Sequence, residues 1–541
     1  MFQMKRYVRN QTLVAFCSVL AAGLSQSAQA ATLCVGSATG CKTTIAAAIT
    51  AAAAGDTIQV GAGTYKEVVT ITKSLSLIGA GSATTIIDAT GLATGVSVDG
   101  TASTTPISGV VVSGFTVKNA NFQGIVVQNA SSVTIWNNQV LNNNKGLNTT
   151  KAMPTCPGLP AALQSGENQD CGEGINLAGA DHSTVSNNVV QGNSGGILIS
   201  DDQSATHDNV ISGNLVTLNL TACGITMASH SGKGVYHNTV TGNQVVKNGI
   251  GFAGAGAGIG LFAAGPGNKT YGNVVVNNTL TGNGLPGVTM HNHAAPAGPP
   301  PAVLDDNIIV GNVITGNGPD LGDAATPGPT GINIFSLVPV KGLVITQNVI
   351  SQESVGLAFN APGNFAPSLN NITASFAIDI IGQGTVNAAQ NWFGGACTGG
   401  GPNTSGCEVV SSGVLVTPWL TTPFTGTQLP VAPGGPTPPS TGGSAVTIVV
   451  TGPGGATSTT NTFQTLSLQV TLSASASTSA NTGALTYAWT PSPGFPVSGI
   501  TGGNTATPTF QFPTPGTYQY TLTVTDSTGA SANTTVTVQF I

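Results

Sequence analysis

The residues best suited to chemistry are acidic residues and histidines that gather in one part of the chain. All six histidines lie between residues 182 and 293, although only 6% of the 541 residues are charged. Asp201 and Asp202, then His230, then His293 follow equivalent short apolar runs, and Glu173 comes directly before the glycine of an earlier run. An imidazole held by a carboxylate can act as a general base near neutral pH. We therefore expect these five residues to form a catalytic site.

The same residue types also suit a metal ion. Two carboxylates offer oxygen ligands for calcium, and an added imidazole suits zinc or copper. Asp201, Asp202 and His230 are therefore the expected metal ligands, with calcium or another divalent ion as the cofactor. One alternative stays open, because acidic residues and histidines on turns are often solvated or hydrogen-bonded to neighbouring amides. The residues to which it applies most are those in adjoining turns, His207, Asp208 and His237.

A repeated phrase between residues 124 and 356 indicates how these residues are positioned. Each of its seven copies has a glycine, a β-branched residue, an aliphatic residue, a polar break and a second strand that ends in asparagine. One asparagine column consists of Asn138, Asn188, Asn214, Asn243, Asn278, Asn312 and Asn348. A second consists of Asn143, Asn193, Asn219, Asn248, Asn283 and Asn317, with Glu353 in the last copy, and a partial third of Asn209, Asn238, Asn273 and Asn307. This pattern predicts a parallel β-solenoid whose corner asparagines bond to their equivalents one coil away.

In-register coils turn sequence columns into spatial neighbours, about 5 Å apart at the backbone. Asp202 and His230 fall in one column, one coil apart, and His293 lies in that column two coils further. Glu173 falls at the edge of the same ribbon. Before the repeats, "TTIAAAITAAAAG" predicts a short helix ended by Gly55. Such a helix would cover the apolar end of the solenoid and protect its open edge.

The composition divides the chain into four parts. Residues 1–30 have a basic start, an apolar stretch and a small-residue cleavage site, as a secretory signal peptide has. Residues 31–427 are the expected solenoid, and the Pro/Gly-rich residues 428–444 are the expected linker. Residues 445–541 contain about seven short alternating runs separated by turns, which predicts a β-sandwich. The mature protein is therefore expected outside the cytoplasm: secreted, periplasmic or at the cell surface.

Cysteine spacing agrees with export. Six cysteines form three local pairs suited to disulfides, namely Cys34 with Cys41, Cys156 with Cys171, and Cys397 with Cys407. Spacing alone does not prove this connectivity. Cys223 is left over, and its flanks, "ACGITM", predict a thiol packed in a buried strand.

The charge balance excludes several partners. Without residues 1–30 the chain keeps ten lysines and no arginine against 19 acidic residues, a net charge of −9. Such a chain offers no nucleic-acid-binding surface. No later apolar run reaches the roughly 18 residues that span a bilayer. The sequence leaves the oligomeric state open.

Three segments resemble known families. The stretch from Thr43 to Gly81 resembles the start of right-handed parallel β-helix proteins of the pectin-lyase-like superfamily, and "GTYKEVV" resembles the opening of pectinesterases. The segment "AAQNWFGGACTGGGP" is similar to the closure of bacterial β-helix and NosD-like proteins. "LTYAWT" and "GTYQYTLTVTDSTGAS" resemble PKD/Ig-like domains. The resemblance implies an all-β chain, with a right-handed parallel β-helix followed by a small Ig-like/PKD sandwich.

The resemblance also implies a function, because β-helices of this superfamily commonly handle acidic polysaccharides along their outer face. The first hypothesis is an exported polysaccharide-active enzyme, a metal-assisted lyase or related enzyme. The second is a non-catalytic scaffold or glycan-binding protein of the cell surface, with polysaccharide or cell-surface glycan as the partner. A third is NosD-like periplasmic metal handling. No catalytic motif of these families transfers residue by residue, so all three remain open at this stage.

Overall fold

The computed structural model describes most of the chain. It covers residues 30–103, 107–150, 155–163, 172–251, 256–292, 300–322, 326–394, 402–404, 407–425, 446–451, 461–465, 469–479, 485–491, 499–511, 516–526 and 531–540. Residues 1–29 of the expected signal peptide and the whole expected linker lie outside these ranges.

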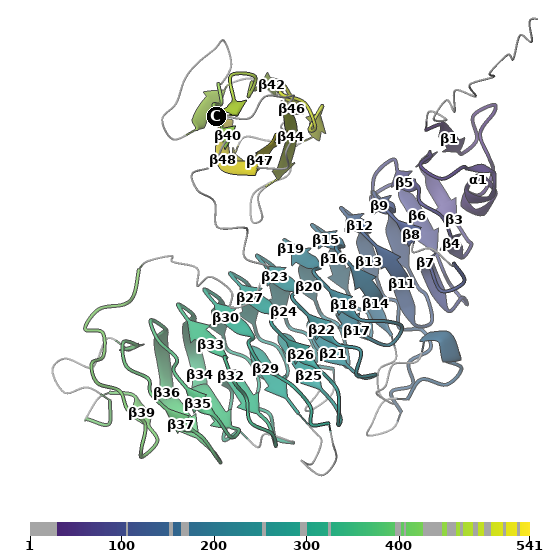
Figure 1. The fold of residues 1–541 in the computed structure, drawn as a ribbon. Helices are drawn as coiled ribbons and strands as arrows, with labels where there is room; N and C mark the ends of the chain where they lie inside the picture. Colours follow the sequence, from purple (N-terminus) through teal and green to yellow (C-terminus); the bar gives the residue numbers. More distant parts are fainter. Residues whose placement is uncertain are drawn as a thin grey trace, which may run out of the picture.

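Residues 30–425 form a parallel β-helix, as the repeats predict (Figure 1). The first face is an 11-stranded parallel sheet. Its strands are β1 (Thr32–Val35), β2 (Thr57–Val60), β5 (Ser76–Gly79), β9 (Val111–Ser113), β12 (Thr134–Trp136), β15 (Thr184–Ser186), β19 (Val210–Ser212), β23 (Thr239–Thr241), β27 (Val274–Val276), β30 (Ile308–Val310) and β33 (Val344–Thr346).

Two more faces are joined because β34 and β36 run around the corner between them. The second face holds β3 (Gly63–Tyr65), β6 (Thr85–Asp88), β10 (Thr116–Lys118), β13 (Gln139–Leu141), β16 (Val189–Gln191), β20 (Leu215–Thr217), β24 (Gln244–Val246), β28 (Thr279–Thr281), β31 (Val313–Thr315), β34 (Val349–Asn360), β36 (Asn371–Ile380) and β38 (Trp392–Phe393). The third holds β4 (Val69–Ile71), β7 (Thr94–Asp99), β11 (Gln123–Ser131), β14 (Glu173–Asp181), β17 (Gly195–Ser200), β21 (Ile225–Ser229), β25 (Ile259–Ala263), β29 (Val288–His291), β32 (Thr330–Phe335) and β39 (Val409–Val410).

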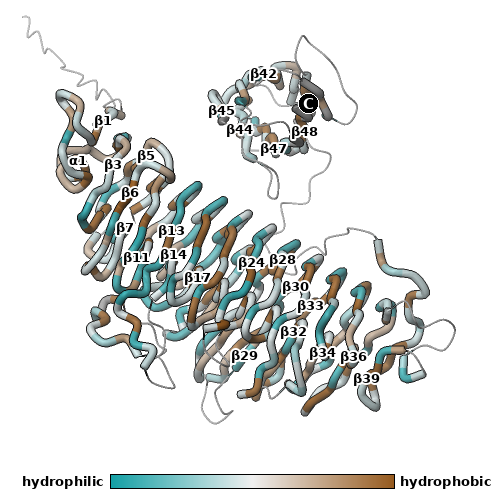
Figure 2. Tube along the Cα trace, turned by 180° about the vertical axis from the view of Figure 1, so that it is seen from behind, coloured by the Kyte–Doolittle hydropathy of each residue, from teal (hydrophilic) through white to brown (hydrophobic). Residues whose placement is uncertain are grey.

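Short segments complete the helix. They are β8 (Ile107–Ser108), β18 (Thr206–His207), β22 (Val235–Tyr236) and β26 (Thr270–Tyr271), the pair β35 (Asn364–Phe365) and β37 (Thr385–Val386), and the 3₁₀ turn η1 (Ala161–Leu163). β18, β22 and β26 stack in register and extend the third face beyond a loop that follows β17, β21 and β25. Hydrophobic segments recur in successive coils (Figure 2), and their inward side chains form one continuous core.

Asparagine ladders hold the corners, as predicted. In the first column, Asn243 Nδ2 donates to Asn278 Oδ1 at 2.9 Å, and the backbone N–H of Asn243 donates to the same oxygen at 3.0 Å. The ladder runs on past the repeats through Asn370 to Asn391. The second and third columns repeat this bonding. These asparagines are almost completely buried, so each bond satisfies polar groups that would otherwise be costly to bury.

The glycine that opens each copy has a packing reason. A Cβ on Gly124 would collide with Val140, and one on Gly224 would collide with Val245. These valines lie in the core at the corner one coil further along, on β13 and β24. The third face bends so closely over that corner that only glycine fits, which the column pattern alone did not explain.

The only α-helix among the described residues is α1 (Ile45–Ala51), which packs against β1, β2 and β4. Thr44 Oγ1 accepts the N–H of Ala47, and the Glu67 carboxylate accepts the N–H groups of Ile45 and Ala46, both at 2.9 Å. The predicted helix is confirmed but shorter, because the chain becomes extended at Ala52 rather than at Gly55. Within the described ranges, no helix has the length and apolarity to cross a membrane.

The pectinesterase-like segment builds this N-terminal end. Tyr65 Oη donates to the carbonyl of Gly61 at 2.9 Å, Glu67 caps α1, and Val69 lies in the core. The resemblance in this segment therefore reflects how a β-helix begins.

The cysteines behave as expected where they are described. Cys34 and Cys41 form a disulfide. Cys156 and Cys407 are disulfide-bonded too, and their expected partners, Cys171 and Cys397, lie outside the described residues. Cys223 is buried, and its sulfur accepts the N–H of Ala257 at 3.2 Å.

Residues 446–540 form the predicted sandwich. Its strands are β40 (Val446–Thr447), β41 (Thr462–Thr465), β42 (Gln469–Thr471), β43 (Thr478–Ser479), β44 (Thr486–Pro491), β45 (Gly499–Thr501), β46 (Thr509–Gln511), β47 (Gly516–Thr525) and β48 (Ser531–Phe540). They form a four-stranded sheet, a three-stranded sheet and a two-stranded pair. Trp489, Phe510 and Tyr520 pack at the centre, and Trp489 Nε1 donates to the carbonyl of Thr505 at 3.1 Å.

The carboxylate that ends the second ladder should make stability depend on pH. Burial raises the pKa of Glu353 to about 7, although its bonds from Asn317 and Gly316 favour the charged form. Because the folded state holds this proton more tightly, its stabilising effect is complete below about pH 4.5 and is lost as pH rises through about 7. The loss is roughly 3 kcal/mol. Glu353→Gln keeps an acceptor for Asn317 but does not titrate. Urea unfolding of both proteins from pH 5 to 8 should show a falling difference curve, and parallel curves would contradict this.

Candidate functional site

Asp202 and His230 lie together, as their shared column predicts. The register pairs Ser200 with Ala228, so the residues after them lie one coil apart. His230 Nδ1 lies 3.0 Å from Asp202 Oδ1, and only 3% of the His230 side chain is exposed. An ionised carboxylate only accepts hydrogen bonds, so Nδ1 carries the hydrogen and Nε2 is the basic nitrogen. The pair has the arrangement of a general base held by a carboxylate.

Asp201 has a different task. Its Oδ1 accepts the N–H groups of His230 and Ser231, and its Oδ2 accepts the Ser229 hydroxyl and the N–H of Gly234. Burial opposes its ionisation, but these four donors outweigh burial and lower its pKa.

Both oxygens of Asp201 therefore face hydrogen-bond donors. These donors occupy the oxygens that a cation would need, so the surroundings are unfavourable for a cation. The expected metal set Asp201, Asp202 and His230 does not fit a calcium ion, and we derive no metal step there. Asp201 instead holds the turn that carries His230 against Asp202.

Glu173 and His293 do not join this pair in the described structure. Glu173 pairs with Gly195 at the start of the third face, whereas Asp202 follows its end at Ser200. Five strand residues separate these ends, roughly 16 Å. The expectation that Glu173 acts beside Asp202 is therefore wrong, because the strand length keeps them apart. His293 lies outside the described residues.

The outer side of the third face from β14 to β32 is called here the outer face. One register line on it carries four polar side chains together with Leu198 and Gly260. Asn176, Thr226, Thr289 and Asn333 alternate with inward core residues and lie on one register line. From Asn176 to Asn333 this line crosses five coil steps, about 24 Å. The Oδ1 atoms of Asn176 and Asn333 are buried and accept no hydrogen bond. A buried acceptor without a partner costs about 1–3 kcal/mol, so these two atoms are suited to a ligand that brings donors.

A second register line beside it carries rings. His291 lies between Phe262 and Phe335, edge to face, at 5.7 and 5.6 Å between ring centroids. His291 Nε2 lies 3.0 Å from Asp320 Oδ2 and 3.0 Å from the Asn333 amide. The repeat pattern did not indicate this pair, because Asp320 comes from a loop 29 residues after His291.

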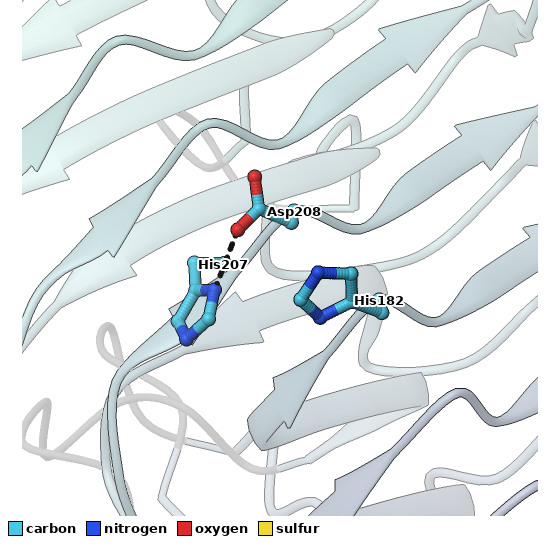
Figure 3. A group of neighbouring side chains, drawn as sticks. All are labelled: His182, His207 and Asp208. Atoms are coloured by element: carbon cyan, nitrogen blue, oxygen red, sulfur yellow. Dashed lines mark hydrogen bonds and ion pairs between the residues drawn. The ribbon is translucent and has the colours of Figure 1, made fainter. Parts of the chain in front are cut away.

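A third group lies at the corner after β14, β18 and β22. It consists of Asp181, His182, His207, Asp208 and His237, and it is called here the histidine corner. Figure 3 shows three of these residues, His182, His207 and Asp208. His207 Nδ1 lies 2.8 Å from Asp208 Oδ2, and His182 Nδ1 lies 2.8 Å from Asp181 Oδ1. For His207, Asp208 and His237, the sequence left open that they are only solvated or bonded to neighbouring amides. The structure instead joins them to one another.

Comparison with known proteins places these groups in context. Residues 55–284 match the family model described as "Periplasmic copper-binding protein (NosD)", and residues 459–539 match a PKD-domain model. The chain combines a NosD-like parallel β-helix with a PKD domain. The NosD-like part includes Asp202, His230 and the whole histidine corner. No curated protein sequence matches the chain.

Solved structures resemble the chain only distantly. The mannuronan C-5 epimerase AlgE6 A-module of Azotobacter vinelandii is 16% identical, with a TM-score of 0.34 over 69% of this chain and 94% of that one. An alginate lyase from Paenibacillus sp. is 14% identical, with a TM-score of 0.34 over 71% and 99%. A nucleoside hydrolase-related hypothetical protein from Saccharophagus degradans, associated with carbohydrate metabolism, is 20% identical with a TM-score of 0.15. That match covers 17% of this chain and 25% of that one, so this chain spans only a quarter of that protein's length.

The two aspartates should respond differently to the same change. Asp201→Asn places an N–H₂ group against hydrogen-bond donors, so we expect a loss of about 3 kcal/mol in the free energy of unfolding. Asp202→Asn keeps an oxygen for His230 Nδ1 and should lose about 1 kcal/mol or less. Urea denaturation at pH 7 measures both. Equal losses would show that Asp201 does not hold the turn.

Proposed function

We propose that this protein is exported and binds a polysaccharide along the outer face from β14 to β32. The observation that carries the proposal is the pair of buried, unsatisfied amide oxygens, Asn176 Oδ1 and Asn333 Oδ1, on one register line. Sugar hydroxyls are donors that can satisfy such acceptors. A line of about 24 Å is suited to an extended chain of sugar units rather than to a single small ligand.

The neighbouring rings support the same ligand class. Phe262 and Phe335 are partly exposed on the outer face, and sugar rings present C–H groups that pack on aromatic rings. The six strands of this face contain no Lys or Arg. His230 and His291 each pair with an aspartate. The face therefore favours hydroxyl contacts, so a neutral polysaccharide fits it better than the acidic glycan expected from the sequence.

Export is part of the proposal. The signal-like residues 1–30 and the Cys34–Cys41 disulfide support a location outside the cytoplasm. The NosD description names a periplasmic protein, in agreement with this. The PKD domain then serves as a spacer or as a second contact to a surface.

A second candidate function is catalysis at the Asp202–His230 pair. With Asp202 holding Nδ1–H, His230 Nε2 can remove the C5 proton beside a uronate carboxylate in a β-elimination, as a lyase does. The C4–C5 double bond forms as the C4–O glycosidic bond breaks, and the leaving oxygen takes a proton from water. Lys233 is the nearest candidate to face that carboxylate, because its Nζ already donates to the carbonyls of Asp202 and Gln203.

Metal handling in the sense of the NosD description has its support elsewhere on the chain. The histidine corner offers imidazole nitrogens and carboxylate oxygens, which are donors that copper and zinc accept. Its donor set fits such an ion, unlike that around Asp201.

Binding to the outer face is testable with the chain from residue 31 onward. Affinity electrophoresis against xylan, β-glucan, galactan, polygalacturonate and alginate should identify a retained polymer. Asn176→Leu and Asn333→Leu remove the acceptors and should each weaken binding at least tenfold. Asn176→Leu should leave the melting temperature unchanged, whereas Asn333→Leu should lower it, because it also removes the Nδ2 contacts with Thr289 Oγ1 and His291 Nε2. Gln244→Leu, an exposed amide on β24 of the second face, is the matched control. No retention by any polymer, or full retention by both Asn variants, would contradict the proposal.

Catalysis has its own test. The same chain is incubated with the uronate polymers, with calcium or with a chelator, and unsaturated products are followed by absorbance alongside reducing ends. If elimination occurs, His230→Gln and Asp202→Asn should abolish it, whereas polymer retention should persist. Retention without turnover leaves the glycan-binding scaffold as the function.

A further inference from the structure

The histidine corner brings together residues from three successive coils. The register aligns Asp181, His207 and Tyr236 on one line, and His182, Asp208 and His237 follow them on the next. The latter three all have left-handed backbones, with φ of 49°, 56° and 55°. Three of the chain's six histidines therefore lie at a single corner, each about 4.8 Å along the axis from the next coil.

We propose that the histidine corner binds one divalent transition-metal ion through His182, His207 and Asp208, with His237 as an additional ligand. One donor atom from each of the first three residues lies within 4.8 Å of the others. Ligand atoms of one tetrahedral zinc ion lie roughly 3.3 Å apart, because each is about 2.0–2.1 Å from the metal. Side-chain rotations that move the donor atoms by about an ångström bring them to the spacing that a bound ion requires. His237 Nδ1 lies 3.8 Å from Oδ1 of the Asp208 carboxylate, which places His237 beside the same acidic group.

The surrounding groups orient these ligands. Asp181 accepts from Ser131 Oγ at 2.7 Å and pairs with His182 Nδ1, which leaves the other ring nitrogen for an ion. A carboxylate on the second nitrogen of a histidine is the usual support for metal-binding imidazoles.

Aromatic stacking fixes the His207 ring. It stacks on Tyr236 at 4.8 Å with an angle of 7°, and Tyr236 stacks on Tyr271 at 5.1 Å with an angle of 16°. This stack continues through three coils on the same register line. A ring that is already held in one plane loses little conformational entropy when a metal binds it.

The donors decide which ion fits. Calcium takes six to eight oxygen ligands, which this corner does not offer. Two or three imidazoles with one carboxylate suit zinc or copper. His182, His207, Asp208 and His237 are all at least a quarter exposed, so an ion can reach them from solvent. The NosD match covers these residues but assigns no ligand, and the assignment here rests on their geometry alone.

The test is metal binding by the untagged chain from residue 31 onward. Isothermal titration with Zn²⁺ should give one site per chain, Zn²⁺ should raise the melting temperature, and Cu²⁺ should give an EPR spectrum with nitrogen splitting. His182→Asn suits the left-handed backbone, as Asn137 and Asn187 do at another corner. His207→Phe keeps the stack on Tyr236 without a ligand nitrogen. Each change should weaken Zn²⁺ binding at least tenfold and reduce the number of nitrogen couplings in the Cu²⁺ spectrum.

Matched variants keep the result decisive. Asp208→Asn should weaken binding as the histidine changes do. Asp306→Asn changes an exposed aspartate with the same left-handed backbone two coils beyond His237, and it should leave binding unchanged. No stoichiometric binding by the unchanged chain would overturn the proposal. Equal binding by His182→Asn and His207→Phe, with unchanged circular dichroism, would place the ion elsewhere and overturn it too. Neither result bears on polysaccharide binding, which involves other residues.

Discussion

The fold depends on hydrogen bonds between equivalent asparagine amides in successive coils. Within a ladder, a corner asparagine such as Asn243 donates twice to the Oδ1 of its equivalent in the next coil, once from Nδ2 and once from its backbone N–H. Every coil is thereby set at the height of one β-ladder step, and a shift of register would break the corner bonds as well as the strand bonds. This regular stacking brings Asp202 to His230 and places His182, His207 and His237 in neighbouring coils. Function on this helix is a matter of which residue stands in each column.

The columns explain why so much of the architecture followed from the sequence. A buried amide such as that of Asn214 must hydrogen-bond to the equivalent amide in the next coil. The recurrence of asparagine therefore predicts both where the corners lie and which residues are neighbours in successive coils. Asp202 and His230 could be paired for the same reason. The sequence also shows where a column ends with another residue type, as the second column does with Glu353 in place of asparagine. There the same ladder accepts a carboxylate only with a strongly raised pKa.

Other features could not be read from columns, because they depend on loop paths or on hydrogen atoms. Asp201 stands next to Asp202 in the sequence, yet four donors of one turn occupy its oxygens. Asp320 contacts His291 from a loop of irregular length, so the spacing of the repeats does not predict this contact. Glu173 shares a ribbon with Asp202, but column arithmetic ignores position along the strand, which separates the two residues. The histidine corner does not follow from any one turn, because its residues meet only when the turns of three coils stack on one another.

Two sites on one rigid support need not share a ligand. The outer face has buried acceptors, partly exposed rings and no lysine or arginine on its strands, which suits hydroxyl groups and gives little reason to bind an ion. The histidine corner lies beyond the loop that follows β17 and β21, and its exposed imidazoles and carboxylates suit a cation and little else. Because each coil is fixed by its ladder, an ion at the corner would change the outer face only by stiffening three coils that are already held. Independence of the two sites is therefore the physical expectation, and strong coupling between metal and polysaccharide would require movement of coils that the asparagine ladders resist.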